Sequence, residues 1–364
     1  MLAKNAKSEG AASAAPASVA YRGYVRRKKA VIAGVFAVTL GIVLWSLSIG
    51  SSGLTIGQVL AALVGMGEER EMLVVWNLRM PRVAVAVLGG CALALAGCVF
   101  QSVLRNPLAS ASTLGISQGA AFGASVAIIV LGAGGQIAAH EGGILAGNPY
   151  ITAFCAFAGG MVSTFVVLGL SRMRRMTPEA IVLAGVALSA LFASATTLVQ
   201  YFAEDYQVAA VVFWTFGDLS RAGYEQIAVM ALVTVAAGVY FFFNRWNYNA
   251  MESGEMTAHS LGVEVNRVRL VGMLVGCAAA SCVIAFCGII NFIGLVVPHV
   301  MRRLIGSDYR YLLPASAVAG SGLLLLSDIA AHTLASPLVL PIGAITSFVG
   351  APVFIYLLFK GVTR

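Results

Sequence analysis

Long stretches of the chain contain no charged residue and are separated by short polar segments. Uncharged runs cover residues 83–104, 142–171, 180–203, 226–244 and 270–301. Each is at least as long as the roughly 18 apolar residues that indicate a membrane-spanning helix. The pattern predicts an all-α polytopic membrane protein.

Division of the chain at its polar segments gives ten predicted spans: 31–50, 83–104, 114–134, 150–170, 179–202, 226–244, 270–287, 289–301, 311–331 and 341–359. The run 270–301 would be about 48 Å long as one helix at 1.5 Å per residue, which exceeds a hydrocarbon core of ~30 Å. We expect a break at Gly288–Gly294, followed by a half-span ending at Pro298. The sequence RNPLA at Arg105–Ala109 predicts a similar break in the first half. Paired breaks suggest an internal structural repeat.

Composition and charge agree with this topology. The chain is 59% hydrophobic and 10% charged, with a net charge of +8, whereas soluble domains carry about 25% charged residues. With both termini placed in the cytoplasm, 19 of the 23 Lys and Arg residues lie inside, as the positive-inside rule predicts. The basic balance therefore implies no nucleic-acid partner. We expect residues 1–29 to be a disordered basic tail, and residues 30–364 to form one domain in the bacterial cytoplasmic membrane.

The sequence shows neither a nucleotide site nor an ion relay. No lysine occurs between Lys29 and Lys360, so a GxxxxGK[ST] loop cannot exist there. The six cysteines lie in apolar runs without metal-ligand spacing, which is typical of small buried side chains. Asp328 falls well inside a predicted span, where an ionisable residue is a candidate relay or a carboxylate satisfied by neighbouring donors. Uphill transport would then need free energy from a partner.

The longest predicted cytoplasmic loop, Arg245–Arg269, is a candidate contact for that partner. Within it, Met251–Leu261 has the spacing of a short amphipathic helix, with Gly262 placed as a left-handed stop. We expect Ala258 and Leu261 to face outward, where they would fit a cleft on a docking protein. An ordinary solvated loop helix is the alternative.

Several segments resemble one family in order along the chain: Asn77–Ala124, Val182–Ala195, Phe292–Gly320 and Leu340–Lys360, the last reading LPIGAITSFVGAPVFIYLLFK. They are similar to the FecCD-type permeases, the membrane subunits of ABC importers for iron chelates, haem and cobalamin. The resemblance implies ten transmembrane helices in a type II ABC importer permease fold.

The same resemblance implies the partners. The expected assembly contains a second, identical or paralogous permease subunit, two cytoplasmic ATPase subunits that bind ATP and Mg²⁺, and an external substrate-binding protein. This chain itself would hold no catalytic site, metal or cofactor. The expected cargo is a ferric siderophore, with haem and cobalamin as alternatives. An ion-coupled secondary transporter is the less favoured reading.

The resemblance also assigns residues to roles. ATPase coupling carries over onto Glu255, Ala258, Leu261 and Gly262, which match the pattern GE-x-x-A-x-x-LG. Docking of the binding protein falls on Arg79, for which snorkelling to the membrane surface is the alternative. His332 stands where the family has a second docking arginine, so it departs from the pattern.

The expected pathway lies along spans five and ten. Its gate and lining residues are Asn106, Leu108, Thr177, Pro178, Glu179, Ala187, Ala190 and Ser194. Glu179 is a second departure, because family members often carry a small polar residue there. The small residues of span five are equally suited to tight helix packing. Trp214 and Phe216 are expected to anchor a short external helix near the pathway mouth.

Overall fold

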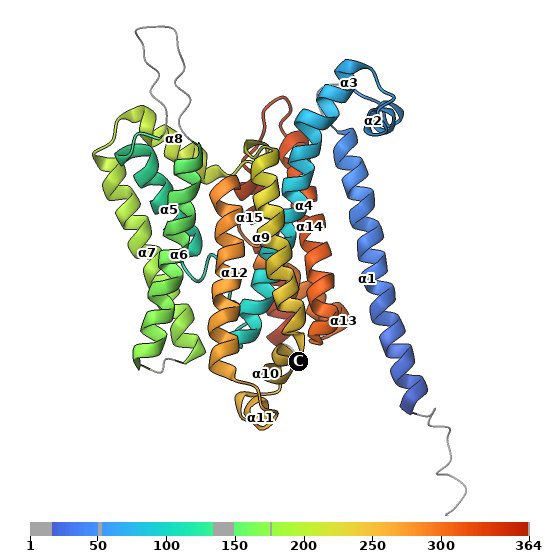
Figure 1. Cartoon of the computed structure of the whole chain (residues 1–364), viewed down its shortest axis with the longest axis vertical. Coiled ribbons are helices and arrows are strands. Elements are labelled where there is room, and N and C mark those ends of the chain that lie inside the picture. Colours follow the sequence, from blue (N-terminus) through green and yellow to red (C-terminus); the bar gives the residue numbers. More distant parts are fainter. Residues whose placement is uncertain (1–16, 50–52, 134–148, 175–176, 363–364) are drawn as a thin grey trace, which may run out of the picture.

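The computed structural model describes residues 17–49, 53–133, 149–174 and 177–362, and over these ranges it contains helices and no strand (Figure 1). Seven helical segments are long and apolar enough to cross a membrane, and two shorter apolar helices cover Ile116–Val130 and Ile342–Leu357. The predicted all-α membrane fold is confirmed. Each of the ten predicted spans overlaps a helix, but the count of ten crossings stays a prediction.

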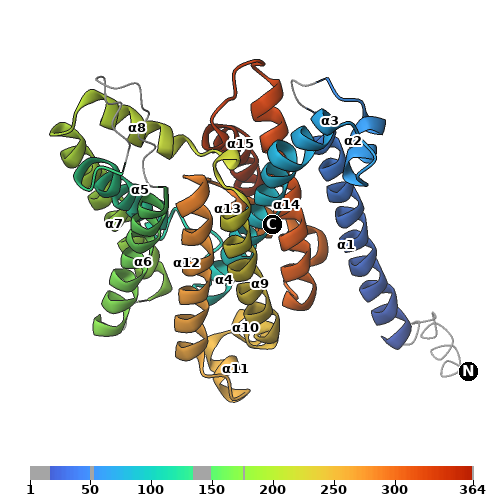
Figure 2. The ribbon, with the colours of Figure 1, turned by 45° about the horizontal axis from the view of Figure 1, so that its top comes forward.

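The helices have the following bounds: α1 Ala17–Ser48, α2 Ile56–Leu63, α3 Glu69–Leu73, the π-helix η1 Val74–Arg79, α4 Met80–Val103, α5 Ile116–Ser125, the π-helix η2 Val126–Val130, α6 Pro149–Arg174, α7 Pro178–Tyr201, α8 Asp205–Phe216, the 3₁₀ turn η3 Leu219–Arg221, α9 Tyr224–Phe243, α10 Arg245–Glu252, α11 Glu255–Ser260, α12 Val265–Cys287, α13 Ile293–Ile305, α14 Tyr309–Thr333 and α15 Ile342–Val362. The two views show α5–α8 grouped on one side, α1 on the other and α12 between them (Figures 1 and 2).

The N-terminal boundary differs from the prediction of a disordered segment up to residue 29. α1 begins at Ala17, so residues 17–29 are helical, and residues 1–16 lie outside the described residues. Lys28 explains the extension, because its side chain is buried and its ammonium group lies 4.3 Å from the Tyr24 ring centre and 5.3 Å from that of Tyr311. Cation–π contacts of this kind hold the start of α1 against α14.

α4 is the central helix, and it packs against α9, α12, α13 and α14. Glycines bring the backbones together: a Cβ atom on Gly97 would lie 1.8 Å from the Gly294 carbonyl oxygen, and one on Gly90 would lie 2.3 Å from that of Gly320. Small residues at helix crossings allow this approach, which is how helices associate in lipid. α4 is accordingly buried along nearly its whole length.

Both predicted breaks are confirmed, but the predicted end of the half-span at Pro298 is wrong, because α13 continues through Pro298 to Ile305. α12 ends at Cys287, where Gly288 has a φ of +78°, and α13 restarts after Phe292 at a φ of +65°. In the first half, α4 ends at Val103, and a non-helical turn precedes α5. The breaks follow the second long helix of each half, as an internal repeat requires, although the repeat itself stays a prediction.

The two ends of the molecule carry different elements. The start of α1, the hairpin α10–α11 and the end of α15 lie at one end, whereas α2, α3 and α8 lie at the other (Figure 1). This grouping matches the expected placement of both termini on the side of loop 245–269. The orientation of that side in a membrane stays a prediction.

Substitution of Gly97 by alanine should destabilise the protein. The new Cβ atom would collide with the backbone of Gly294, so α4 and α13 must separate, at a cost of about 1–3 kcal/mol or more. Gly34→Ala in α1 is the matched control, since nothing lies within 4 Å of its Cβ position. Thermal unfolding in detergent should show a melting temperature several degrees lower for Gly97→Ala alone, and equal melting of the two variants would contradict the packing argument.

Candidate functional site

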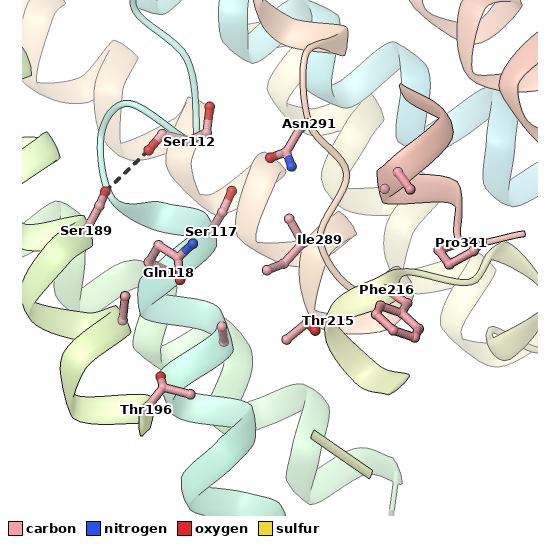
Figure 3. A pocket seen from close by; sticks show the side chains of 14 residues that line it. Ser112, Ser117, Gln118, Ser189, Thr196, Thr215, Phe216, Ile289, Asn291 and Pro341 are labelled. Atoms are coloured by element: carbon pink, nitrogen blue, oxygen red, sulfur yellow. Dashed lines mark hydrogen bonds between the residues drawn. The ribbon is translucent and has the colours of Figure 1, made fainter. Parts of the chain in front are cut away.

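A cavity of about 540 Å³ lies between α5, α7, α8, the segment after α12 and the start of α15 (Figure 3). Hydroxyl and amide side chains dominate its polar lining, and they are Ser112, Ser117, Gln118, Ser189, Thr196, Thr215 and Asn291. None of its lining residues is charged. Such a surface offers hydrogen bonds to a polar solute without binding a bare cation strongly, because hard cations prefer carboxylates.

Local packing explains why α5 turns polar residues toward this space. On one face, Gly119 and Gly123 lie directly against the backbone of α6, and a Cβ atom at Gly123 would be 2.0 Å from the Cys155 carbonyl oxygen. That contact leaves the other face, with Ser117 and Gln118, directed at the cavity (Figure 3). The short side chains of α5 therefore serve packing on one side and lining on the other.

The broken segment after α12 forms the opposite wall. Gly288 ends the helix, and residues 288–292 then run past the cavity as irregular chain. Ile289 and Asn291 face Ser117 and Gln118 across the space (Figure 3). Irregular backbone at membrane depth is tolerated where it lines a cavity. The cavity therefore accounts for the break after α12, and the break supplies one wall of the cavity.

The residues of span five that are predicted to line the pathway lie on one face of α7, and the residues that line the cavity lie on another. The cavity is lined by Ser189, Ala193 and Thr196, whereas Ala187, Ala190 and Ser194 are exposed on the single chain and outside it. At 100° per residue the two sets point in directions about 130° apart. A pathway role for the exposed set stays a prediction that depends on a second subunit.

The predicted gate residues lie at the ends of α4 and α7. The Asn106 side-chain oxygen accepts a hydrogen bond from the Leu108 amide at 2.9 Å, which forms a tight turn after α4. Thr177 caps α7 by accepting from the Ala180 amide at 3.4 Å, and Pro178 is the first helical residue. Glu179 is exposed and interacts electrostatically with Arg105. The gate role of these residues stays a prediction.

The prediction of one continuous amphipathic helix over Met251–Leu261 is wrong. Two helices, α10 and α11, occupy this region, and Gly254 at a φ of +116° separates them. The predicted stop at Gly262 is confirmed, with a φ of +79°. The Ser253–Gly254 pair was the available signal for this break, because Ser-Gly pairs mark turns.

Leu261 faces outward as expected, with 68% of its surface exposed, and Met256 beside it is 84% exposed. Ala258 is fully buried, contrary to the prediction. The chain turns back after Gly262, and the Val263 amide donates to the Ala258 carbonyl at 3.0 Å. This closure, typical of a helix end at a left-handed glycine, folds the following chain over α11 and covers Ala258.

α10 is fixed to the protein core. Tyr248 and Met251 are fully buried, and Asn249 bonds both the Asp308 carboxylate at 3.2 Å and the Tyr309 amide at 2.8 Å. Desolvation acts to raise the pKa of Asp308, but hydrogen bonds from Arg310 and Asn249 outweigh it and lower that pKa. The carboxylate therefore stays charged at neutral pH, and the hairpin α10–α11 (245–260) is a firmly seated protrusion.

At the opposite end, Arg79 does not face outward. Only 4% of the residue is exposed, and its guanidinium donates to the Leu47 carbonyl at the end of α1. His332 is partly exposed, and its Nδ1 lies 3.0 Å from the Asp328 backbone oxygen and 3.5 Å from the Asp328 carboxylate. The predicted docking role of both residues is untested. In this arrangement Arg79 joins η1 to α1.

Asp328 has a charged partner that the sequence did not reveal. Its carboxylate lies 3.0 Å from Nε of Arg82 in α4, and both side chains are buried. The two atoms lack hydrogen-bond alignment, so the contact is an ion pair by distance. In the predicted topology Arg82 is one of the four Lys and Arg residues that lie outside. A lone carboxylate within an apolar span predicts a nearby cation, which was the available signal.

A second cavity, of about 580 Å³, opens beside this pair. Asp218, Arg221, Asp328 and His332 contribute to its lining, and it shares Phe216 and Pro341 with the uncharged cavity. Trp214, the other expected anchor of the external helix, is buried. A charged outer cavity thus adjoins an uncharged inner one.

Comparison with known proteins decides the family, because the FecCD transport family matches residues 38–360. The chain belongs to the FecCD transport family. As a FecCD protein it is a transmembrane permease of ABC importers for iron chelates, haem and related cargo.

Relatives extend over most of the chain. A permease protein assigned to an ABC transporter in Methanocaldococcus jannaschii is 50% identical over 92% of this chain and 95% of that protein. The hemin transport system permease of Yersinia pestis is 34% identical over 79% of this chain and 83% of its own. A solved structure described as an inward-facing, metal-chelate type ABC transporter has a TM-score of 0.79 and 26% identity, and covers 91% of this chain and 99% of that one. Other relatives at similar identity are named for vitamin B12 and Fe(3+)-citrate import.

Removal of the Asp328 charge should destabilise this FecCD permease. Asp328→Asn leaves Arg82 buried without its ionic partner, and loss of one partner of a buried pair costs about 3–5 kcal/mol. The double variant Arg82→Gln, Asp328→Asn should recover part of the loss, because no uncompensated charge remains. Thermal unfolding in detergent measures both, with Glu264→Gln as the exposed control. A single variant as stable as the double variant would contradict the pairing.

Proposed function

We propose that the chain is the ten-span permease subunit of an importer for a ferric siderophore in the cytoplasmic membrane, with both termini in the cytoplasm. It would pair with a second permease subunit, receive cargo from an external binding protein and be driven by two cytoplasmic ATPase subunits that hold ATP and Mg²⁺. The observation that carries the proposal is the family match across residues 38–360.

The coupling role rests on the exposed tip of the hairpin. Met256 and Leu261 project from a seated protrusion, at the end of the molecule that carries the start of α1 and the end of α15 (Figure 1). Apolar side chains on a fixed helix suit a cleft on a partner, and closure of that partner would then move the permease as a rigid body. Of the four predicted coupling residues, Leu261 is suited to direct contact.

The chemistry of the cavity supports a chelate as cargo. Its uncharged lining would bind free Fe³⁺ poorly, whereas a chelator surrounds the metal and presents polar groups that hydroxyls and amides can meet. Two relatives are named for hemin transport and vitamin B12 import, so these cargoes are the alternatives.

An ion-coupled carrier is less well supported. Its relay would have to be Asp328, the acidic residue identified inside a predicted span. That carboxylate lies against Arg82 in a buried contact that joins α14 to α4, so its surroundings favour a structural role.

Uptake of a ⁵⁵Fe-siderophore into proteoliposomes holding permease, ATPase and binding protein tests the proposed function. Transport should require ATP and persist when ionophores abolish proton and sodium gradients. Leu261→Arg should reduce uptake at least tenfold, because the charge cannot enter an apolar cleft, whereas Glu264→Gln in the same loop should leave it unchanged. Uptake driven by an ion gradient without nucleotide would overturn the proposal.

Cargo identity is tested on the binding protein encoded beside the permease. Titration against ferric siderophores, ferric citrate, haem and cobalamin should give the tightest binding for a ferric siderophore, by at least tenfold. If the binding protein prefers haem or cobalamin, the proposed siderophore cargo is wrong, whereas the proposed ATP-driven permease role is unaffected.

A further inference from the structure

Arg269 joins three helices through one guanidinium group. It belongs to the second turn of α12, and its side chain is 14% exposed. Its Nε donates to the carbonyl oxygen of Val103, the last residue of α4, at 2.9 Å. Its Nη2 pairs with the carboxylate of Glu255, the first residue of α11. The coupling hairpin is therefore tied to the end of α4 through a largely buried cation.

A second chain of contacts runs from α10 to the same turn of α4. Asn249 accepts from the Tyr309 amide, and the Tyr309 hydroxyl lies 3.4 Å from Nη2 of Arg302. Arg302 in turn donates to the Gln101 side chain at 3.1 Å. Both helices of the hairpin thus reach the last turn of α4, α11 at Val103 and α10 at Gln101.

That turn leads directly into the gate. The segment after Val103 contains the Asn106–Leu108 turn, and the Thr113 hydroxyl donates to the Leu108 carbonyl at 3.1 Å, which closes the segment on itself. Farther along, the Ser112 carbonyl accepts from Ser189 of α7 at 3.4 Å (Figure 3). Ser112 and Ser189 both line the uncharged cavity. A displacement of the end of α4 would therefore reach the cavity wall through few, well-ordered contacts.

We propose that Arg269 is the positioning residue that transmits movement of the coupling hairpin to the gate turn 104–115, and that Glu255 serves within the permease by holding Arg269. This inference rests on the proposed ATP-driven function. It assigns Glu255 an internal partner instead of a contact on the ATPase. A guanidinium is required because its separate nitrogens reach two acceptors in different directions, whereas the three donors of a lysine ammonium share one nitrogen.

The test uses the full complex in proteoliposomes and reports on the gate without cargo. Leu108→Cys, on the partly exposed gate turn, is modified with a membrane-impermeant maleimide with and without a non-hydrolysable ATP analogue. The native cysteines are buried or half-buried, and the chain without Leu108→Cys measures their background. With the native Arg269, nucleotide should change the labelling rate at least fivefold.

Arg269→Ala should reduce that nucleotide response to less than twofold, and Arg269→Lys should not restore it. Glu255→Gln should lower the response two- to threefold, since the hydrogen bond to Val103 remains. Arg267→Ala is the matched control, because Arg267 lies two residues away and is 78% exposed, with a 3.6 Å contact to Glu264; its response should equal that of the native protein. Copurification of the ATPase checks assembly of each variant.

A full response in both Arg269→Ala and Glu255→Gln would overturn the proposal, and full rescue by lysine would overturn the two-contact role. If Arg269→Ala does not assemble, the isosteric Glu255→Gln, at a partly exposed side chain, decides the matter. The absence of any nucleotide response with native Arg269, together with the absence of ATP-driven uptake, would instead overturn the proposed function.

Discussion

Backbone contact along α4 is the constraint on which the rest of the structure depends. In lipid, burial of apolar surface does not by itself draw helices together, so association rests on close packing. Gly90 and Gly97 allow α14 and the start of α13 to touch the backbone of α4. That approach brings Arg82 of α4 within reach of Asp328 in α14. At the other end of α4, Val103 contacts Arg269 of α12, which in turn pairs with Glu255. One rigid helix therefore connects the Arg82–Asp328 pair to the hairpin α10–α11.

The helix breaks are the cost of placing a cavity in this packed bundle. Residues 104–115 and 288–292 give up helical hydrogen bonds, which is tolerated at membrane depth only where the backbone finds other partners. In the first break the Asn106 and Thr113 side chains supply them, and in the second the Asp218 amide donates to the Cys287 carbonyl at 2.8 Å. Both breaks border the uncharged cavity, through Ser112 on one side and Asn291 on the other. The two breaks thus lose helical hydrogen bonds, and in return they place polar groups in a cavity wall that can hydrogen-bond a solute.

The sequence predicted the features that depend on length, charge and glycine. The run 270–301 exceeds one bilayer crossing, so its break near Gly288 followed from geometry, and Gly262 followed from the conformational freedom of glycine. The burial of Ala258, the pairing of Arg82 with Asp328 and the inward position of Arg79 did not follow. The positions of Arg82 and Arg79 depend on which residues a distant helix presents, and the burial of Ala258 depends on how the chain folds back after Gly262. Local periodicity carries no information about either.

Charge is segregated from the inner cavity, and the segregation bears on mechanism. Arg82 and Asp328 neutralise each other, Arg269 is engaged by Glu255, and Arg302 by Gln101 and Tyr309. These groups are fixed in pairs that hold helices together, whereas the inner cavity is lined by hydroxyls, amides and apolar side chains. A wall of this kind makes similar weak contacts with many polar solutes, so it offers little basis for discrimination between them. The charged groups therefore fix how the helices pack against one another, whereas the cavity between them keeps an uncharged wall.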